Sequence, residues 1–205
     1  MSKQLAFHVN AAVCTGCKAC QVACKDKNNL EVGRLFRRVY DVDGGGWVER
    51  NGFMEPNVFA YSLSISCMHC QSPLCLEVCP TGATFKRADG IVMVNKDVCI
   101  GCRYCEWACP YGARVYNETT HTVTKCNMCA DLLDQGEQPA CVGSCPMRAL
   151  EVGELSALQA KYGMADEVYP LPTADVTRPA VVIQAHRDAS LVKARGGYIA
   201  NEDEV

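Results

Sequence analysis

The cysteines constrain this protein more than any other feature, because sixteen of its 205 residues are cysteine and they fall into four groups of four. The first and third groups share the spacing C-x2-C-x2-C-x3-C. The second has a middle gap of four residues, and an eleven-residue segment divides the fourth. No cysteine is left over. The groups are Cys14, Cys17, Cys20 and Cys24; Cys67, Cys70, Cys75 and Cys79; Cys99, Cys102, Cys105 and Cys109; and Cys126, Cys129, Cys141 and Cys145.

This spacing is typical of ligands for cubane iron-sulfur clusters. Gaps of two residues let one short loop present three thiolates to one face of a cluster. In bacterial two-cluster ferredoxins the fourth cysteine is usually followed by proline and binds the other cluster of the pair. Pro80, Pro110 and Pro146 occupy that position in three groups, whereas Lys25 does so in the first. The pattern predicts four 4Fe-4S clusters.

Three other uses of cysteine fit less well. Structural zinc sites also use C-x2-C pairs, but they take two pairs per ion rather than a triplet with a distal Cys-Pro. Disulfide scaffolds belong to secreted chains, and we find no secretory segment at the start of the sequence. Cysteines two residues apart in one loop also pair poorly. Buried reduced cysteine, used as a small apolar side chain, does not explain a fourfold pattern.

Composition narrows the range of partners. A net charge of -3 without a basic stretch argues against nucleic-acid binding. The longest apolar stretches, such as 58–65, are far shorter than the roughly 20 residues that span a bilayer. We therefore expect no direct membrane span.

Short strands and helices are predicted around the ligand loops. Each unit reads as strand, ligand loop, helix and strand, which is half of a bacterial ferredoxin, and Asp89-Gly90 signals a hairpin turn. Four such halves make two modules, so the predicted fold class is α+β with two ferredoxin-like modules of two 4Fe-4S clusters each. The predicted strands are 5–9, 84–87, 91–95, 114–117, 122–125 and 150–152, and the predicted helices are 18–28, 103–108 and 127–135.

The linkers suggest which halves pair, although the spacing does not decide it. A compact hairpin joins the second and third groups, so residues 67–110 are predicted to form one module. Residues 1–29 plus 111–153 would then form the other. The predicted ligand sets are Cys14, Cys17, Cys20 and Cys145 for cluster 1; Cys24, Cys126, Cys129 and Cys141 for cluster 2; Cys67, Cys70, Cys75 and Cys109 for cluster 3; and Cys79, Cys99, Cys102 and Cys105 for cluster 4.

Two segments lie outside these modules. Residues 30–66 are predicted to be a β insertion, with strands at 34–42, 46–50 and 54–65 around the turn signals 43–46 and 51–52. It could bind another subunit or cover the joint between the modules. Residues 154–205 are predicted to be a C-terminal extension that packs on a partner subunit. It has a helix at 156–162, an extended run at 169–179 and a strand at 180–184, and its end, 186–205, is expected to be disordered or to lie along the partner.

No arrangement of side chains for bond chemistry stands out, so no catalytic residue is predicted. The histidines, His8, His69, His121 and His186, are scattered. His69 lies inside the second ligand loop and is expected to be solvated, with a hydrogen bond to a cluster sulfur as the alternative. Basic residues next to the ligands could balance the charge of the clusters, or could be ordinary surface charges: Lys18, Lys25, Arg103, Lys125 and Arg148.

Four segments carry a resemblance to a known family: AVCTGCKACQVACKDKNN, SISCMHCQSPLCLEVCPTGA, DVCIGCRYCEWACPYGA and TKCNMCADLLDQGEQPACVGSCPMRAL. They resemble the four-cluster iron-sulfur subunits of the dimethyl sulfoxide reductase family of molybdoenzymes. The likeness continues through FRRVYDVDGGGW and the terminal GGYIANEDEV, so it covers nearly the whole sequence.

The resemblance implies a non-catalytic subunit that relays electrons between a membrane anchor, which oxidises quinol, and a molybdopterin catalytic subunit. It implies cluster 1 nearest the molybdenum subunit and cluster 4 nearest the quinone. Some relatives have tryptophan in place of Cys102 and hold a three-iron cluster there, so cysteine implies four 4Fe-4S clusters. The subunit would be peripheral, held at the membrane by its partners and exported with the catalytic subunit, with a cytoplasmic location as the alternative. Related subunits serve formate, polysulfide, arsenate and tetrathionate enzymes, so the terminal substrate stays open.

Overall fold

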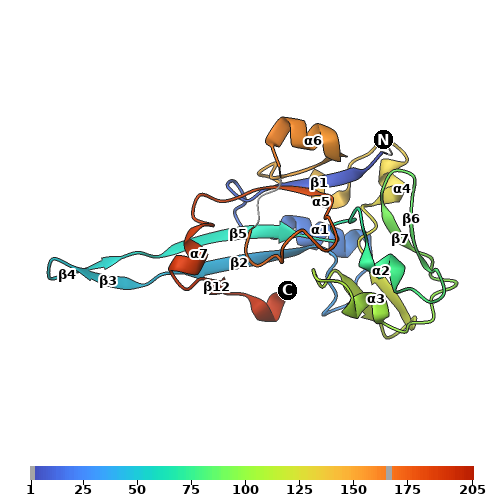
Figure 1. Ribbon diagram of the computed structural model, residues 1–205, viewed down its shortest axis with the longest axis horizontal. Coiled ribbons are helices and arrows are strands. Elements are labelled where there is room, and N and C mark those ends of the chain that lie inside the picture. The colour runs from blue at the N-terminus through green and yellow to red at the C-terminus, as the bar shows by residue number, and fades with distance from the viewer. Residues whose placement is uncertain (1–2, 165–167) are drawn as a thin grey trace.

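The N-terminal strand is the centre of a three-stranded sheet that joins both ends of the chain. In the computed structural model, which describes residues 3–164 and 168–205, β1 (Leu5–Asn10) pairs antiparallel with β10 (Leu150–Glu154). Its other edge pairs in parallel with β11 (Val181–Gln184). Figure 1 shows the blue N-terminal strand next to the orange-red C-terminal part. The first ligand loop, which follows β1, is thereby anchored to the end of the chain.

A helix covers this sheet. α6 (Leu155–Tyr162) follows β10 directly and buries Leu155 and Leu158 against Ala6, Ala180 and Val182. These side chains form a small apolar cluster of their own, next to the main core. Burying each such side chain contributes roughly 1.5–3 kcal/mol. The helix therefore holds the edges of the sheet together on one face.

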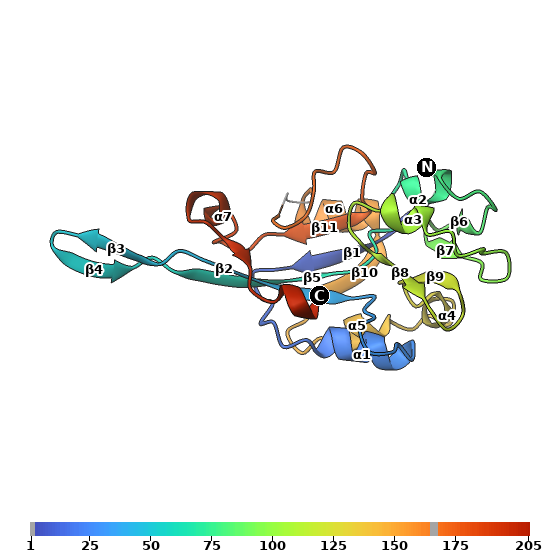
Figure 2. The same ribbon diagram turned by 90° about the horizontal axis from the view of Figure 1, so that it is seen from below.

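The insertion forms a long two-stranded ribbon that extends from the body of the molecule (Figures 1 and 2). β2 (Arg38–Gly44) pairs antiparallel with β5 (Phe59–Ile65), and the ribbon continues in β3 (Trp47–Arg50) and β4 (Phe53–Pro56). The base of the ribbon is buried, since Val42 and Leu63 have no exposed surface. Its tip exposes apolar side chains, among them Trp47 and Phe53.

The glycines at 44–46 do not reverse the chain, in contrast to the expected turn signal at 43–46. They separate β2 from β3 while the ribbon continues, and only Asn51 and Gly52, both with positive φ, form the reversal. Gly45 has φ +83°, and a Cβ there would lie 2.4 Å from the carbonyl oxygen of Asn57. The glycines thus allow the two strands to approach closely. Residues 34–37, predicted to be extended, precede the strand.

Five short helices accompany the ligand loops: α1 (Ala19–Lys27), α2 (Leu74–Glu77), α3 (Tyr104–Trp107), α4 (Ala130–Leu133) and α5 (Ala140–Gly143). α1 packs against α5, so the first and fourth cysteine groups adjoin. α2 packs against α3, which brings the second and third groups together. The helices of the first and fourth cysteine groups therefore form one pair, and those of the second and third groups form the other.

Two hairpins complete the body. β6 (Thr84–Lys86) pairs with β7 (Val92–Val94), and β8 (Arg114–Asn117) pairs with β9 (Thr122–Lys125). These hairpins and β1, β10 and α1 match elements predicted from the sequence to within a few residues. The mixed α and β architecture is the predicted fold class. α2 and α5, of four residues each, were not predicted.

The end of the chain folds back on the insertion. After α7 (Leu191–Ala194), β12 (Tyr198–Ile199) pairs with β2, and a 3-10 helix follows at Glu202–Glu204. Asn201 accepts a hydrogen bond from the Asp41 N–H and donates one to the carbonyl of Val39. Residues 186–205 were expected to be disordered or to lie along a partner. Within this segment, residues 198–201 bind the edge of the protein's own β2. Packing of residues 154–205 on a partner subunit stays a prediction.

In the two ranges that the structure describes, no helix has the length and apolarity needed to cross a bilayer.

Candidate iron-sulfur sites

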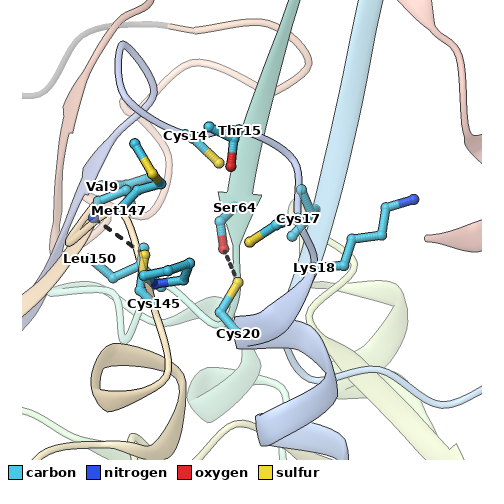
Figure 3. Close-up of a pocket in the computed structure, with 13 residues that line it drawn as sticks. Val9, Cys14, Thr15, Cys17, Lys18, Cys20, Ser64, Cys145, Met147 and Leu150 are labelled. Atoms are coloured by element: carbon cyan, nitrogen blue, oxygen red, sulfur yellow. Dashed lines mark hydrogen bonds between the residues drawn. The ribbon is translucent and has the colours of Figure 1, made fainter.

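The cysteines predicted to bind cluster 1 line a single cavity. Cys14 and Cys17 come from the loop between β1 and α1, Cys20 is the second residue of α1, and Cys145 comes from the turn after α5 (Figure 3). Apolar side chains from β1, β2 and β10 line it as well, together with polar ones from Thr15 and Ser64. The first and fourth cysteine groups therefore contribute thiols to one site.

A second quartet, predicted for cluster 4, also lines one cavity. Cys99 and Cys102 come from the loop leading into α3, Cys105 is the second residue of α3, and Cys79 follows α2. Across the described residues, no three His, Cys, Asp or Glu side chains are arranged to hold a single metal ion. The thiols border a cavity instead.

Backbone geometry curls both triplet loops in the same way. Gly16 and Gly101 each have φ +67°, and the residues after the next cysteine, Lys18 and Arg103, have φ 59° and 64°. Left-handed residues at these positions turn successive N–H groups toward the inside of the loop, a geometry that favours anions. The first and third cysteine groups, which have the same spacing, therefore also share their backbone conformation.

Thiols of the other two quartets lie close enough to act on one another, and the same interactions also join neighbouring quartets. The thiols of Cys141 and Cys129 act electrostatically on Cys24, and burial raises the pKa of Cys24 to about 12. Cys126 is also coupled to Cys24 and Cys141, and in addition to Cys67 of the next quartet. Quartets 2 and 3 are therefore neighbours.

The thiols of quartet 3 interact in the same way. Burial raises the pKa of Cys70 to about 12, and the thiols of Cys67, Cys75 and Cys109 contribute to that shift. Such thiols lose their protons readily only when a metal compensates the charge. All sixteen cysteines are free of disulfides.

Backbone N–H groups point at several of the sulfurs. The Met128 N–H donates to Sγ of Cys126 at 3.3 Å, and the Ala149 N–H donates to Sγ of Cys145 at 3.3 Å. For Cys79, burial opposes ionisation, but the N–H of Thr84, 3.5 Å from Sγ, helps to lower the pKa of the thiol. Free thiols in quartets, with N–H donors and apolar linings, fit the ligand shell of a 4Fe-4S cluster. Zinc sites of the ribbon type would need two-pair geometry instead.

The basic residues next to the ligands mostly face solvent. Lys18 pairs with Asp41 and Glu204 and points away from the cavity (Figure 3). Arg103 pairs with Glu106, and Arg148 is exposed. Lys25 donates to the carbonyl of Glu31. Lys125 alone among the five is buried, and its ammonium binds the carbonyls of Val92 and Cys126.

His69 is buried, so the expectation of a solvated loop histidine was wrong. Its side chain has no exposed surface. Nδ1 accepts a hydrogen bond from the Val92 N–H at 3.0 Å, so the proton is on Nε2, which has no protein partner among the described residues. Burial, with the nearby cations Lys125 and Arg114, lowers its pKa well below the usual value, and the ring is neutral. Later in the same loop, the N–H groups of Gln71 and Ser72 donate to the carbonyls of Arg178 and Thr177.

Two functional candidates were missed by sequence reasoning, Arg37 and Arg114. Both guanidinium groups are buried, with exposed fractions of 1% and 3%, and both act electrostatically on ligand thiols. Arg37 is far from any ligand in sequence, and its neighbours suggested only a strand. Its position within the strand predicted at 34–42 did not distinguish it from Arg34 and Arg38 in the same segment.

Comparison with known families agrees with this chemistry. Models of the "4Fe-4S dicluster domain" match residues 13–83 and 58–155. The two matches overlap in the second cysteine group, so they do not decide how the groups pair.

Two relatives match this sequence over nearly its whole length. The sequence is 50% identical to the B subunit of anaerobic dimethyl sulfoxide reductase from Escherichia coli (strain K12), over 100% of both proteins. It is 44% identical to the corresponding B subunit from Haemophilus influenzae, over 99% of this chain and 100% of the relative. The B subunit of polysulfide reductase from Wolinella succinogenes is 37% identical, over 78% of this chain and 82% of the relative. The protein therefore belongs to the family of dimethyl sulfoxide reductase B subunits, iron-sulfur proteins whose 4Fe-4S dicluster domains transfer electrons.

Proposed function

We propose that this protein binds four 4Fe-4S clusters and connects a molybdopterin catalytic subunit to a membrane anchor that oxidises quinol. The observation that carries the proposal is the cavity that Cys14, Cys17 and Cys20 share with Cys145. A triplet from one cysteine group, completed by the last cysteine of another group, is the exchange found in two-cluster ferredoxins. When bound, such clusters accept and donate single electrons.

The proposed ligand sets are those predicted from the sequence. Cavity lining supports sets 1 and 4, and electrostatic coupling of the thiols supports sets 2 and 3. Coupling of Cys126 to Cys67 supports a linear order in which set 2 adjoins set 3. The protein's own residues would then exclude water from the clusters, supply N–H donors to the sulfurs and hold neighbouring sites at fixed separation.

Metal analysis of oxygen-free material tests the cofactor proposal. Four clusters require about sixteen irons and as many acid-labile sulfides per polypeptide. Zinc at these sites, or far less iron, would contradict it. Mass spectrometry of the complex purified from its native host tests the partners. A large molybdenum-containing subunit and a membrane subunit are expected, and a polypeptide isolated alone from both membrane and soluble fractions would refute them.

The terminal substrate follows from the partner rather than from this subunit. The full-length relatives of 44–50% identity are named for dimethyl sulfoxide, so we propose that substrate first. Polysulfide is the second candidate, because a relative of 37% identity is named for it. Reduction assays with both oxidants on the purified complex distinguish them.

The subunit is proposed to be peripheral and held at the membrane through its partners, on the outer face. Protease treatment of intact spheroplasts tests the side. Cleavage before lysis is expected for an exported complex, whereas cleavage only after lysis would place it in the cytoplasm.

A further inference from the structure

Arg37, just before β2, and Arg114, the first residue of β8, bury positive charges without a carboxylate partner. Their side chains are almost completely enclosed. In the part of the chain that the structure describes, neither forms a salt bridge. Arginine does not lose its proton in proteins, and an isolated buried charge is costly. Each guanidinium therefore needs a source of negative charge inside the protein.

Arg37 lies among thiols of two predicted ligand sets. Nη1 donates to Oγ of Ser64 at 3.1 Å, and that hydroxyl is 3.3 Å from Sγ of Cys20 in set 1. Burial acts to lower the pKa of Arg37, but Cys141 and other thiolates of set 2, together with Cys20, raise it. Nη2 donates to Oγ of Ser66 at 3.0 Å, and Nε has no protein partner among the described residues.

Arg114 lies near thiols of the other two predicted ligand sets, sets 3 and 4. Nη1 donates to Oγ1 of Thr84 at 3.1 Å, while Nη2 is buried without a partner among the described residues. Burial acts to lower the pKa of Arg114, but the thiolates of Cys75 in set 3 and Cys105 in set 4 raise it. A guanidinium with a free N–H thus faces thiols of two sets here as well.

Reduction adds one negative charge to a cluster. A fixed positive charge nearby stabilises the reduced form, and its effect is strong where water is excluded. We propose that the buried positive charges of Arg37 and Arg114 raise the reduction potentials of nearby clusters. Arg37 would raise those of clusters 1 and 2, and Arg114 those of clusters 3 and 4. The proposal rests on the proposed four-cluster function.

Potentiometric titration of the purified complex, followed by electron paramagnetic resonance, tests the inference. Arg37→Gln should shift two of the four midpoint potentials to more negative values, and Arg114→Gln should shift the other two. Arg37→Lys should lie near the unsubstituted protein, because it keeps the charge. Arg38→Gln is the matched control, since Arg38 is the next residue along and donates to the carbonyl of Tyr111 at 2.6 Å. It should leave all four potentials unchanged.

Different results would refute the proposed four-cluster function and the proposed role of the two arginines. Absence of iron from the unsubstituted complex would refute the proposed function. A full iron content with unchanged potentials in both glutamine variants, or equal shifts of all four clusters, would overturn only the inference. Should Arg37→Gln lose iron, retention of iron in Arg37→Lys supports the need for charge. Equal loss in both variants would show that the shape of arginine matters rather than its charge, and would overturn the inference.

Discussion

The Sγ atom of Cys20 lies 3.3 Å from the hydroxyl oxygen of Ser64, although the two residues are 44 positions apart in the sequence. Ser64 is on β5, the strand that returns from the insertion, and Cys20 is at the start of α1 (Figure 3). The same hydroxyl accepts a hydrogen bond from Arg37. The base of the insertion therefore forms part of the wall of the first site, in addition to any role in binding a partner.

Ser64→Ala should lower the reduction potential of one cluster, because it removes a polar partner of Cys20. It should also destabilise the protein by about 1–3 kcal/mol, since part of the Arg37 guanidinium stays buried without its acceptor. Redox titration and thermal unfolding measure the two effects. Ser62→Ala is the control on the same strand, because Ser62 contacts Asp41. Equal potentials in the Ser64→Ala and Ser62→Ala proteins would contradict the assigned contact.

Cys14→Ser and Cys145→Ser should alter the same cluster, because both thiols line one cavity. Cys24→Ser should alter a different one, since its thiol is coupled to Cys141 and Cys129. Electron paramagnetic resonance of the reduced complexes compares the three variants. If Cys145→Ser changed the signal that Cys24→Ser changes, the pairing between the ends of the chain would be wrong.

Gly101→Ala should disrupt the cluster 4 loop. An alanine at φ +67° costs about 1–2 kcal/mol, and its Cβ would also lie 2.2 Å from the carbonyl oxygen of His121. Gly82→Ala is a matched control with φ +66° and no atom within 4 Å of the added Cβ. Iron content and the cluster 4 signal should fall in the first variant and persist in the second. Similar iron contents in the two proteins would show that the loop can move away from His121.

Stability should decrease as the pH falls below about 6.5, the ordinary pKa of histidine, in part because of His8. Burial lowers the pKa of His8, although its 2.9 Å contact with Gln184 and the charge of Glu151 oppose that shift and Lys161 adds to it. The folded protein therefore binds fewer protons than the unfolded one in this window, and stability that is present above it is lost on acidification.

His8→Gln removes the titrating group and should make the melting temperature less dependent on pH. Thermal unfolding of the complex between about pH 5.5 and 7.5, the range in which histidine titrates, measures the difference. Tyr162, which stacks on His8 at 3.7 Å, stays in place in both proteins. Parallel curves for the two proteins would show that other groups cause the dependence.

Deletion of residues 198–205 should make cluster 1 more sensitive to oxygen. The deletion removes β12, both hydrogen bonds of Asn201, and the ion pair between Glu204 and Lys18 in the first ligand loop. Decay of the cluster signals in air measures the effect. Glu204→Gln removes only the exposed ion pair with Lys18 and should behave like the full-length protein. Uniform decay of all clusters in the truncated protein would argue against a local role of the tail.

The spacing of the cysteines predicts the ligand loops and their flanking strands well, because these depend on local sequence. Asp89 and Gly90, for example, lie between the two strands that they were predicted to join. Helices α2 and α5 were not predicted, although α3 and α4, which are equally short, lie within predicted helices. The pairing of β12 with β2 depends on a distant strand edge, which no local pattern reveals.

The charge balance of the sites could not be predicted for a similar reason. Lys18 and Arg103 are next to ligands in sequence, yet they bind carboxylates at the surface. Arg37 reaches the thiols only because β2 and β5 pair and bring it to Ser64. Proximity in sequence is therefore a poor guide to the counter-charges of these sites.

The position of β1 between β10 and β11 has a consequence for biosynthesis. The ribosome releases β1 first and β11 among the last strands, so this sheet cannot close until translation is nearly finished. The two central cysteine groups are complete much earlier. A product truncated before residue 145 would contain Cys14, Cys17 and Cys20 but would lack the fourth thiol that lines their cavity.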